Sequence, residues 1–260
     1  MENNCPNCNE VVDGNFCSNC GQKRYKRIDR KYIWDEIQYT VLHTNKGFLY
    51  SIKNLIKNPG KTAKEYIEGK RVNHYKPILL VFVLSGISTF ISFKIVGLNE
   101  TMKEIYLSKG MYSDFMRDAL SFSASYSSFI MVFLIPFLAL FSKIAFRKWG
   151  HNYYEHVVMN AYVLSFYALL DIIVVFPIMY LMKNTIGIFE FLPFLSLYLL
   201  PFVWVWFYKG LYKERSIKSI ISKVLLILLL IFAGFIVYVI ITTIVILCLG
   251  LESILTPTSF

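Results

Sequence analysis

Five apolar stretches, each about 20 residues or longer and separated by short charged segments, constrain this chain most. They cover approximately residues 77–98, 126–146, 153–177, 188–208 and 224–249. A helix needs about 20 apolar residues to cross the roughly 30 Å hydrocarbon core of a bilayer. The sequence therefore predicts an all-α membrane protein with five transmembrane helices. The composition agrees, because 56% of the residues are hydrophobic, more than soluble domains usually contain.

The basic residues are distributed unevenly around these spans. Residues 1–77 hold 14 of the 27 Lys and Arg, and the segments that follow the second and fourth spans hold 3 and 5. The segments after the first, third and fifth spans hold 3, 1 and none. Because basic loops stay in the cytosol, we expect a cytosolic N-terminus and a periplasmic or extracellular C-terminus. No signal peptide is recognisable before residue 78, so the first span is expected to direct insertion.

Four cysteines near the N-terminus are spaced as two pairs. Cys5 and Cys8 form one Cys-x2-Cys pair, and Cys17 and Cys20 form the other. Paired knuckles of this kind place four thiolates around one tetrahedral zinc ion. Disulfides are disfavoured in a reducing cytosol, and a redox pair normally accompanies a βαβ pattern that is absent here. We predict a minimal structural zinc ribbon with no coordination position left for chemistry.

Three regions follow from these features: a zinc ribbon at 1–22, basic amphipathic interfacial helices at 23–76, and the five-span bundle at 77–260. Helical periodicity with Lys around the apolar faces indicates helices that lie along the membrane surface; a small cytosolic helical domain is the alternative. A lipid bilayer with anionic headgroups is the expected partner of the basic residues, which we favour over nucleic acid. The basic residues predicted to contact the membrane surface are Lys23, Arg24, Lys26, Arg27, Lys70 and Arg71.

The third span carries polar residues whose contact with lipid acyl chains would be unfavourable. At about 100° per residue, its polar side chains fall on one stripe, which should face protein or water. This candidate functional stripe comprises Tyr153, Glu155, His156, Asn160, Tyr167 and Asp171. Two other interpretations remain open for its first turn: Glu155 and His156 begin a helix at the interface, or His151, Glu155 and His156 bind a metal ion. Asp171 is expected to have neutral partners, such as Tyr167 or serines of other spans.

Several stretches make the chain resemble an uncharacterised family of bacterial multi-pass membrane proteins with an N-terminal zinc ribbon. They are FCSNCGQ, KGFLYSIKNLIKNPGKTAKEYIEGKRVNHYKP, YYEHVVMNAYVLSF and LYKERSIKSIISK. The second stretch is the most specific; its fitting residues are Gly47, Phe48, Leu55, Pro59, Gly60, Tyr66, Gly69, Arg71 and Pro77. The resemblance implies a multi-pass protein of the cytoplasmic membrane and assigns no activity.

Three functional classes are compatible with the sequence. A membrane scaffold or adaptor, whose zinc ribbon docks a protein partner, is favoured by the closed metal site and by the lack of a recognisable catalytic motif. A transporter, channel or membrane-perturbing effector is favoured by the polar stripe and by the prolines in the second and fourth spans. An enzyme would use Glu155 and His156 as its reactive pair. Homo-oligomerisation is left open.

Overall fold

The chain divides into two compact units, Met1–Asn45 and Lys46–Phe260. The structure, a computed structural model, describes residues 4–5, 8, 10–21, 47–70, 73–183, 189 and 191–248. Four of the basic residues predicted to contact the membrane surface, at positions 23, 24, 26 and 27, lie outside the described residues, as does Arg71. Lys70 is described, and its side chain is exposed.

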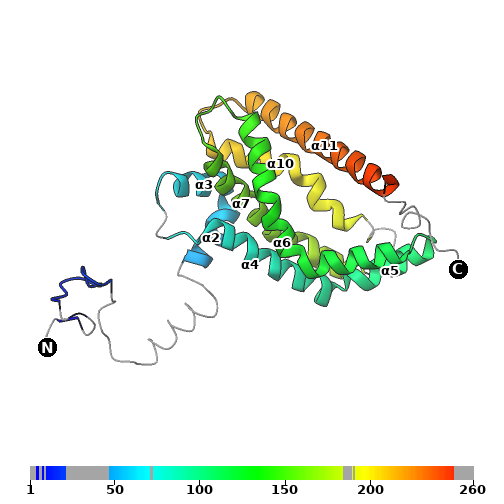
Figure 1. The fold of residues 1–260 in the computed structure, drawn as a ribbon, viewed down its shortest axis with the longest axis horizontal. Helices are drawn as coiled ribbons and strands as arrows, with labels where there is room; N and C mark the ends of the chain where they lie inside the picture. Colours follow the sequence, from blue (N-terminus) through cyan, green and yellow to red (C-terminus); the bar gives the residue numbers. More distant parts are fainter. Residues whose placement is uncertain are drawn as a thin grey trace. The chain divides into compact units, whose positions relative to one another are not determined.

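Helices make up the described part of the second unit (Figure 1). Two short helices come first: α2 (Gly47–Lys57) and α3 (Pro59–Ile67). The longer elements follow, in chain order α4 (Pro77–Phe90), η1 (Ile91–Val96), α5 (Leu98–Ser108), α6 (Asp114–Ala145), α7 (Tyr153–Leu170), η2 (Asp171–Val175), α8 (Phe176–Met182), η3 (Leu192–Phe194), α10 (Leu195–Leu211) and α11 (Ile217–Cys248). The segments η1 and η2 are π-helical and continue α4 and α7, whereas η3 is a 3-10 turn that leads into α10.

Five helical segments are long and apolar enough to cross a membrane, which confirms the predicted fold class. They are Pro77–Val96, Asp114–Ala145, Tyr153–Met182, Leu192–Leu211 and Ile217–Val245. Three of them extend beyond the expected bounds. The second begins at Asp114 instead of about residue 126, and the third continues to Met182 instead of about residue 177. The fifth begins at Ile217 instead of about residue 224.

Local sequence signals explain where the helices begin. Proline occupies the first turn of α3 and of α4, where its missing N–H is not needed. The Asn58 side chain accepts a hydrogen bond from the Lys61 N–H (2.9 Å) and caps α3. Asn152 and Glu155 form a reciprocal capping box at the start of α7, with bonds of 2.7 and 2.9 Å. Gly97 ends η1 with a φ of 75°, which glycine adopts without strain.

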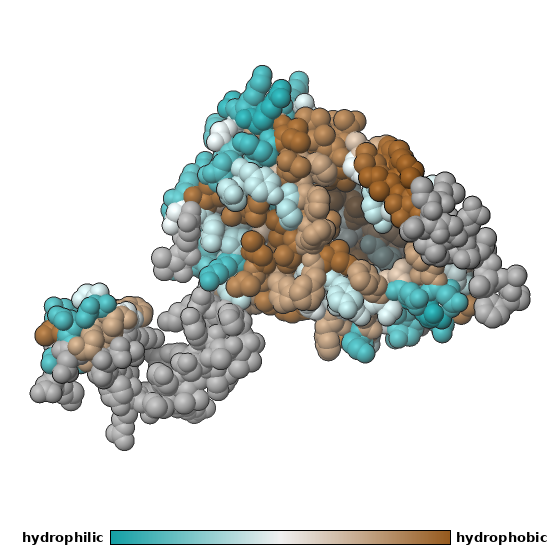
Figure 2. Space-filling view, in the orientation of Figure 1, coloured by the Kyte–Doolittle hydropathy of each residue, from teal (hydrophilic) through white to brown (hydrophobic). Residues whose placement is uncertain are grey.

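The third span is the central helix of the bundle. Within the most apolar window of each span, 56% of the α7 segment is buried, against 11% of the α11 segment. Helices α4, α6 and α7 pack on one another, and α10 contacts α7. Figure 1 shows α11 on the outside, where it packs on α6 and α10. In Figure 2, apolar residues cover the surface of α11, and hydrophilic residues gather over α3 at one end and over α5 at the other.

The two short helices before the first span pack on the bundle. Helix α3 lies against α7 and α10, and it buries Gly60, Thr62 and Ala63. Helix α2 buries Leu55 completely, and its Ser51 hydroxyl accepts a hydrogen bond from the Tyr75 N–H (2.8 Å). The apolar faces of α2 and α3 thus include residues that contact protein.

The first unit contains a small cysteine-centred core. Cys5, Val12 and Cys17 are buried together, with Cys8 packed against them. The backbone is held by one antiparallel bridge between Asn4 and Val11 and by a hydrogen bond from Cys5 N–H to Glu10 C=O (2.7 Å). So small a core cannot stabilise a fold without further support.

Candidate functional site

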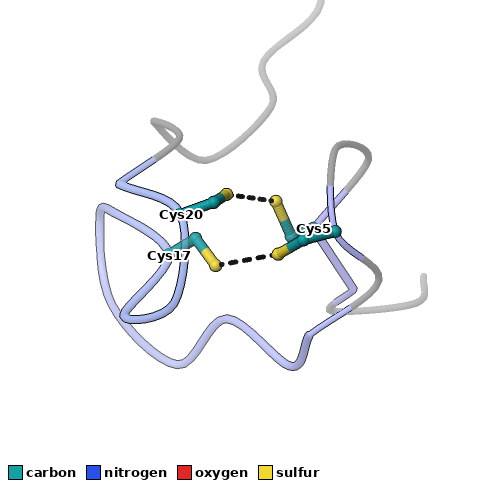
Figure 3. Close-up of side chains that lie close together, drawn as sticks. Cys5, Cys17 and Cys20 are labelled. Atoms are coloured by element: carbon teal, nitrogen blue, oxygen red, sulfur yellow. Dashed lines mark hydrogen bonds between the residues drawn. The ribbon is translucent and has the colours of Figure 1, made fainter.

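The four predicted cysteines come together in the first unit. The sulfur of Cys5 lies 3.6 Å from that of Cys20, and the sulfur of Cys8 lies 3.5 Å from that of Cys17. All four sulfurs lie within 4.8 Å of one another. Figure 3 shows Cys17 and Cys20 on one turn of the backbone, facing Cys5 across the centre of the cluster. Residues 15 positions apart in the sequence are thus arranged around one point.

This geometry fits a tetrahedral metal site. With zinc–sulfur bonds of about 2.3 Å, the sulfurs of a site with four thiolate ligands are about 3.8 Å apart. A disulfide would require about 2.05 Å, so the observed 3.5 and 3.6 Å exclude that pairing. The four cysteines could therefore hold a metal ion, and a set of four thiolates suits zinc. A bound ion would fix the backbone that the small core leaves poorly supported.

The polar residues in the first half of α7 face α6. The His156 ring places Nδ1 3.0 Å from the Ser142 hydroxyl oxygen. The Asn160 amide donates to the same hydroxyl oxygen (2.9 Å) and to the His156 backbone carbonyl (2.8 Å). All three side chains are buried, with exposed fractions of 0–1%. We call Ser142, His156 and Asn160 the buried polar triad.

A serine beside a histidine is also the arrangement of an activated nucleophile. In the triad, however, Ser142 and His156 have no exposed surface that a substrate could reach. The Ser142 hydroxyl also donates to the Ala139 carbonyl (3.1 Å). The geometry supports a structural link between α6 and α7 better than a catalytic pair.

The polar residues in the second half of the third span face α10 instead. The Tyr167 hydroxyl donates to the Ser196 backbone carbonyl (2.7 Å). The Ser196 side chain also lies close to the Asp171 carboxyl group. A neutral side chain of another span thus lies beside Asp171. Asp171 also begins the π-helical turn η2, a distortion that often occurs at functional sites.

The stripe therefore contacts two different helices and forms no single site. Its first residue, Tyr153, donates to the Pro136 carbonyl of α6 (3.2 Å). Glu155 serves the capping box, which agrees with the interpretation of this turn as a helix start. Within the described ranges, the four cysteines are the one group of three or more His, Cys, Asp or Glu residues placed to hold a metal ion. The alternative metal site at His151, Glu155 and His156 gains no support.

An aromatic cluster joins the loops at the end of the bundle where α7 begins. The Tyr212 hydroxyl lies 3.0 Å from His151 Nδ1, and the Arg215 guanidinium lies 5.1 Å from the centre of the Trp149 ring. The Trp149 ring also packs on Phe146 (4.9 Å). Burial lowers the pKa of His151, although the nearby Glu155 carboxylate opposes this shift. These contacts join the segment between α6 and α7 to the segment after α10.

Sequence reasoning missed Ser142, Ser196 and Tyr212 as partners of the polar residues. Each of these three residues stands in or beside one of the apolar segments of the sequence. Which serine meets which residue of α7 depends on the rotation and height of neighbouring helices, and hydropathy carries no such information.

A family model described as a protein of unknown function (DUF3667) matches residues 45–89. No curated protein and no solved structure matches the chain significantly. The matched segment contains α2, α3 and most of α4, and it includes the stretch that we identified as most specific. This match confirms that the chain resembles a family whose function is uncharacterised.

Proposed function

We propose that this protein is a membrane-embedded adaptor whose zinc-bound ribbon docks a protein partner at the membrane surface. One observation carries the proposal. Phe16 and Val11 expose 61% and 55% of their surface on a unit whose core is very small. Large apolar side chains on a metal-supported module are costly in water and favour contact with another protein.

The charge of the ribbon supports a protein partner over nucleic acid or lipid. Residues 1–22 contain Glu2, Glu10 and Asp13 and no Lys, Arg or His. A zinc ion held by four thiolates adds a further net charge of about −2. Phosphate groups would be repelled by this surface. The partner therefore presents an apolar pocket with basic residues around it.

The second unit supplies the membrane anchor in this proposal. We propose that it resides in the bacterial cytoplasmic membrane with the N-terminus in the cytosol, because the basic segments then remain inside. Lys23, Arg24, Lys26, Arg27, Lys70 and Arg71 would contact anionic headgroups at about 1 kcal/mol per charge. The ribbon would then stay close to the bilayer, where it meets its partner.

The test is photo-crosslinking from the ribbon of the full-length protein. A photo-reactive amino acid replaces Phe16 in one variant and the exposed, polar Asn19 in the control. We expect one discrete crosslinked protein from position 16 and much less from position 19. A Phe16→Ser variant that retains its metal should no longer co-purify that protein from mild detergent. Equal co-purification with wild type and Phe16→Ser would contradict the proposal.

A transport function is the second candidate, and Asp171 favours it. This residue is an acid within a span and begins a π-helical turn, and such residues often belong to ion or proton pathways. Asp171→Asn separates the two functions, because Asn retains the size and a hydrogen-bonding capacity but removes the acid. If the protein is a transporter, liposomes that contain wild type would show a proton or cation flux, and liposomes that contain the Asp171→Asn variant would show none. A pure adaptor gives no flux from either protein.

A further inference from the structure

A cleft of about 290 Å³ lies between α3 and the start of α7. Its lining residues are Tyr66, Ile67, Asn152, Tyr154, Glu155 and Val158. We infer that this cleft binds the headgroup of a zwitterionic lipid that carries a primary ammonium group, the chemistry of phosphatidylethanolamine. The site involves neither the ribbon nor its partner, so it is independent of the proposed adaptor function.

The position of the cleft suits a lipid headgroup. The apolar segment that contains α7 begins at Tyr153. If it spans the bilayer, Asn152, Tyr154 and Glu155 lie at the level where hydrocarbon gives way to headgroups. Tyrosines concentrate at this level of membrane proteins. Ile67 and Val158 supply the apolar part of the lining, against which the first carbons of an acyl chain can pack.

The cleft has one charged residue in its lining, Glu155, and a lysine one turn away on α3. Glu155 contributes a carboxylate from α7, and one of its oxygens accepts the Asn152 N–H. Lys64 of α3 lies close enough to His151 to act on its charge, as Glu155 does. The Lys64 ammonium group also pairs loosely with Glu214 at 3.7 Å and with Glu68 at 3.9 Å. A headgroup with its ammonium beside Glu155 and its phosphate towards Lys64 would match this arrangement. A purely anionic headgroup would be repelled by the Glu155 carboxylate.

The lining selects a primary ammonium group. The N–H groups of the ammonium can donate to the Glu155 carboxylate, while the ammonium cation lies against the rings of Tyr66 and Tyr154. A choline group has no N–H to donate. The volume is at the lower limit of small-molecule sites, which are about 300–1,000 Å³. A headgroup fits this volume better than a larger metabolite.

The test is native mass spectrometry of the full-length protein with three dioleoyl lipids added at equal concentration: phosphatidylethanolamine, phosphatidylcholine and phosphatidylglycerol. We expect wild type to retain phosphatidylethanolamine about fivefold over either other lipid. Glu155→Gln should abolish this preference, because Gln keeps the capping box while it removes the charge. Glu104→Gln is the matched control, an exposed glutamate on α5, and it should retain the preference.

A second variant keeps the inference testable if Glu155→Gln fails to fold. Tyr154 is 77% exposed, so Tyr154→Ala should fold normally and reduce retention of phosphatidylethanolamine. Free phosphoethanolamine at millimolar concentration should not displace the lipid, because it lacks the acyl chain. Displacement would assign the cleft to a soluble amine and overturn the lipid assignment. Equal retention of phosphatidylethanolamine and phosphatidylcholine, or an unchanged preference in Glu155→Gln, would also overturn it.

Discussion

Gly60 of α3 and Gly210 of α10 lie against each other, so that the backbones of the two helices touch. A Cβ atom at Gly60 would lie 1.9 Å from the Phe207 carbonyl oxygen, and one at Gly210 would lie 3.3 Å from the Gly60 Cα. Only glycine permits so close an approach. This contact fixes α3 on the bundle, and Gly60 belongs to the segment that the family model matches.

Gly60→Ala should therefore separate α3 from α10. We expect a loss of about 3 kcal/mol in the free energy of unfolding, because the added methyl group meets backbone atoms that cannot move independently. Tryptophan fluorescence during thermal unfolding in detergent measures this loss. Gly86→Ala is the control: its Cβ would lie 3.5 Å from the Ser128 hydroxyl, an ordinary contact. An equal effect of both substitutions would show that the close approach has no energetic role.

Cys17→Ser should remove the metal ion from the ribbon. We expect one zinc ion per wild-type chain and none in the variant, since a hydroxyl is a poor fourth ligand for a thiolate site. Elemental analysis of the purified protein measures the content. The thermal unfolding of the spans should remain unchanged, and Ser18→Ala, at the exposed neighbouring position, should keep its zinc. Wild-type protein without zinc would refute the assignment.

The buried polar triad allows a comparison of two serines. Ser142→Ala leaves His156 Nδ1 without its partner, so we expect a loss of roughly 1–2 kcal/mol in the free energy of unfolding. Ser165 is equally buried, but its hydroxyl makes no hydrogen bond in the described part of the chain. Ser165→Ala should therefore cost little. Thermal unfolding of both variants measures the difference, and equal losses would mean that the Ser142 hydrogen bonds contribute nothing.

His74 should make the protein less stable in mild acid. Burial lowers its pKa below the usual 6.5, and the Glu65 carboxylate only partly opposes this. The unfolded state then binds a proton more readily than the folded state does, so stability falls as the pH drops below about 6.5. As the pH is lowered from about 7.5 to 5.5, the midpoint of thermal unfolding should fall less steeply in the His74→Gln variant than in wild type. Parallel slopes for both proteins would exclude His74 as a source of the effect.

The proposed orientation predicts which loops are accessible from outside the cell. A cysteine at Glu214 should resist an impermeant maleimide in intact cells, whereas one at Ser108 should react, because the five spans alternate in direction. Cys248 is replaced beforehand, so that its own thiol does not contribute to the maleimide labelling. Permeabilised cells provide the control for the reactivity of position 214. Labelling of position 214 from outside would reverse the orientation and with it the cytosolic ribbon.

Helix boundaries show where sequence reasoning loses accuracy. The apolar content of residues 126–146 predicted the second span, but α6 begins at Asp114. The preceding residues are mixed in polarity, so hydropathy gave no reason to join them to the span. Ser113 provides the N-cap, since its hydroxyl accepts the Met116 N–H (3.2 Å). A capping serine is a weak signal on its own, because serine also occurs throughout loops.

Spacing and composition alone were sufficient for the features that depend on local chemistry. Two Cys-x2-Cys pairs predicted the cysteine cluster, because thiolates at that spacing converge on one ion. Long apolar stretches predicted five helices, because a backbone without water must satisfy its own hydrogen bonds. Tertiary structure decided the rest: that His156 and Asn160 meet Ser142, that Tyr167 meets Ser196, and that α3 rests on α10 at Gly60. These pairings depend on how neighbouring helices rotate and approach, and that is set by the packing of all side chains together.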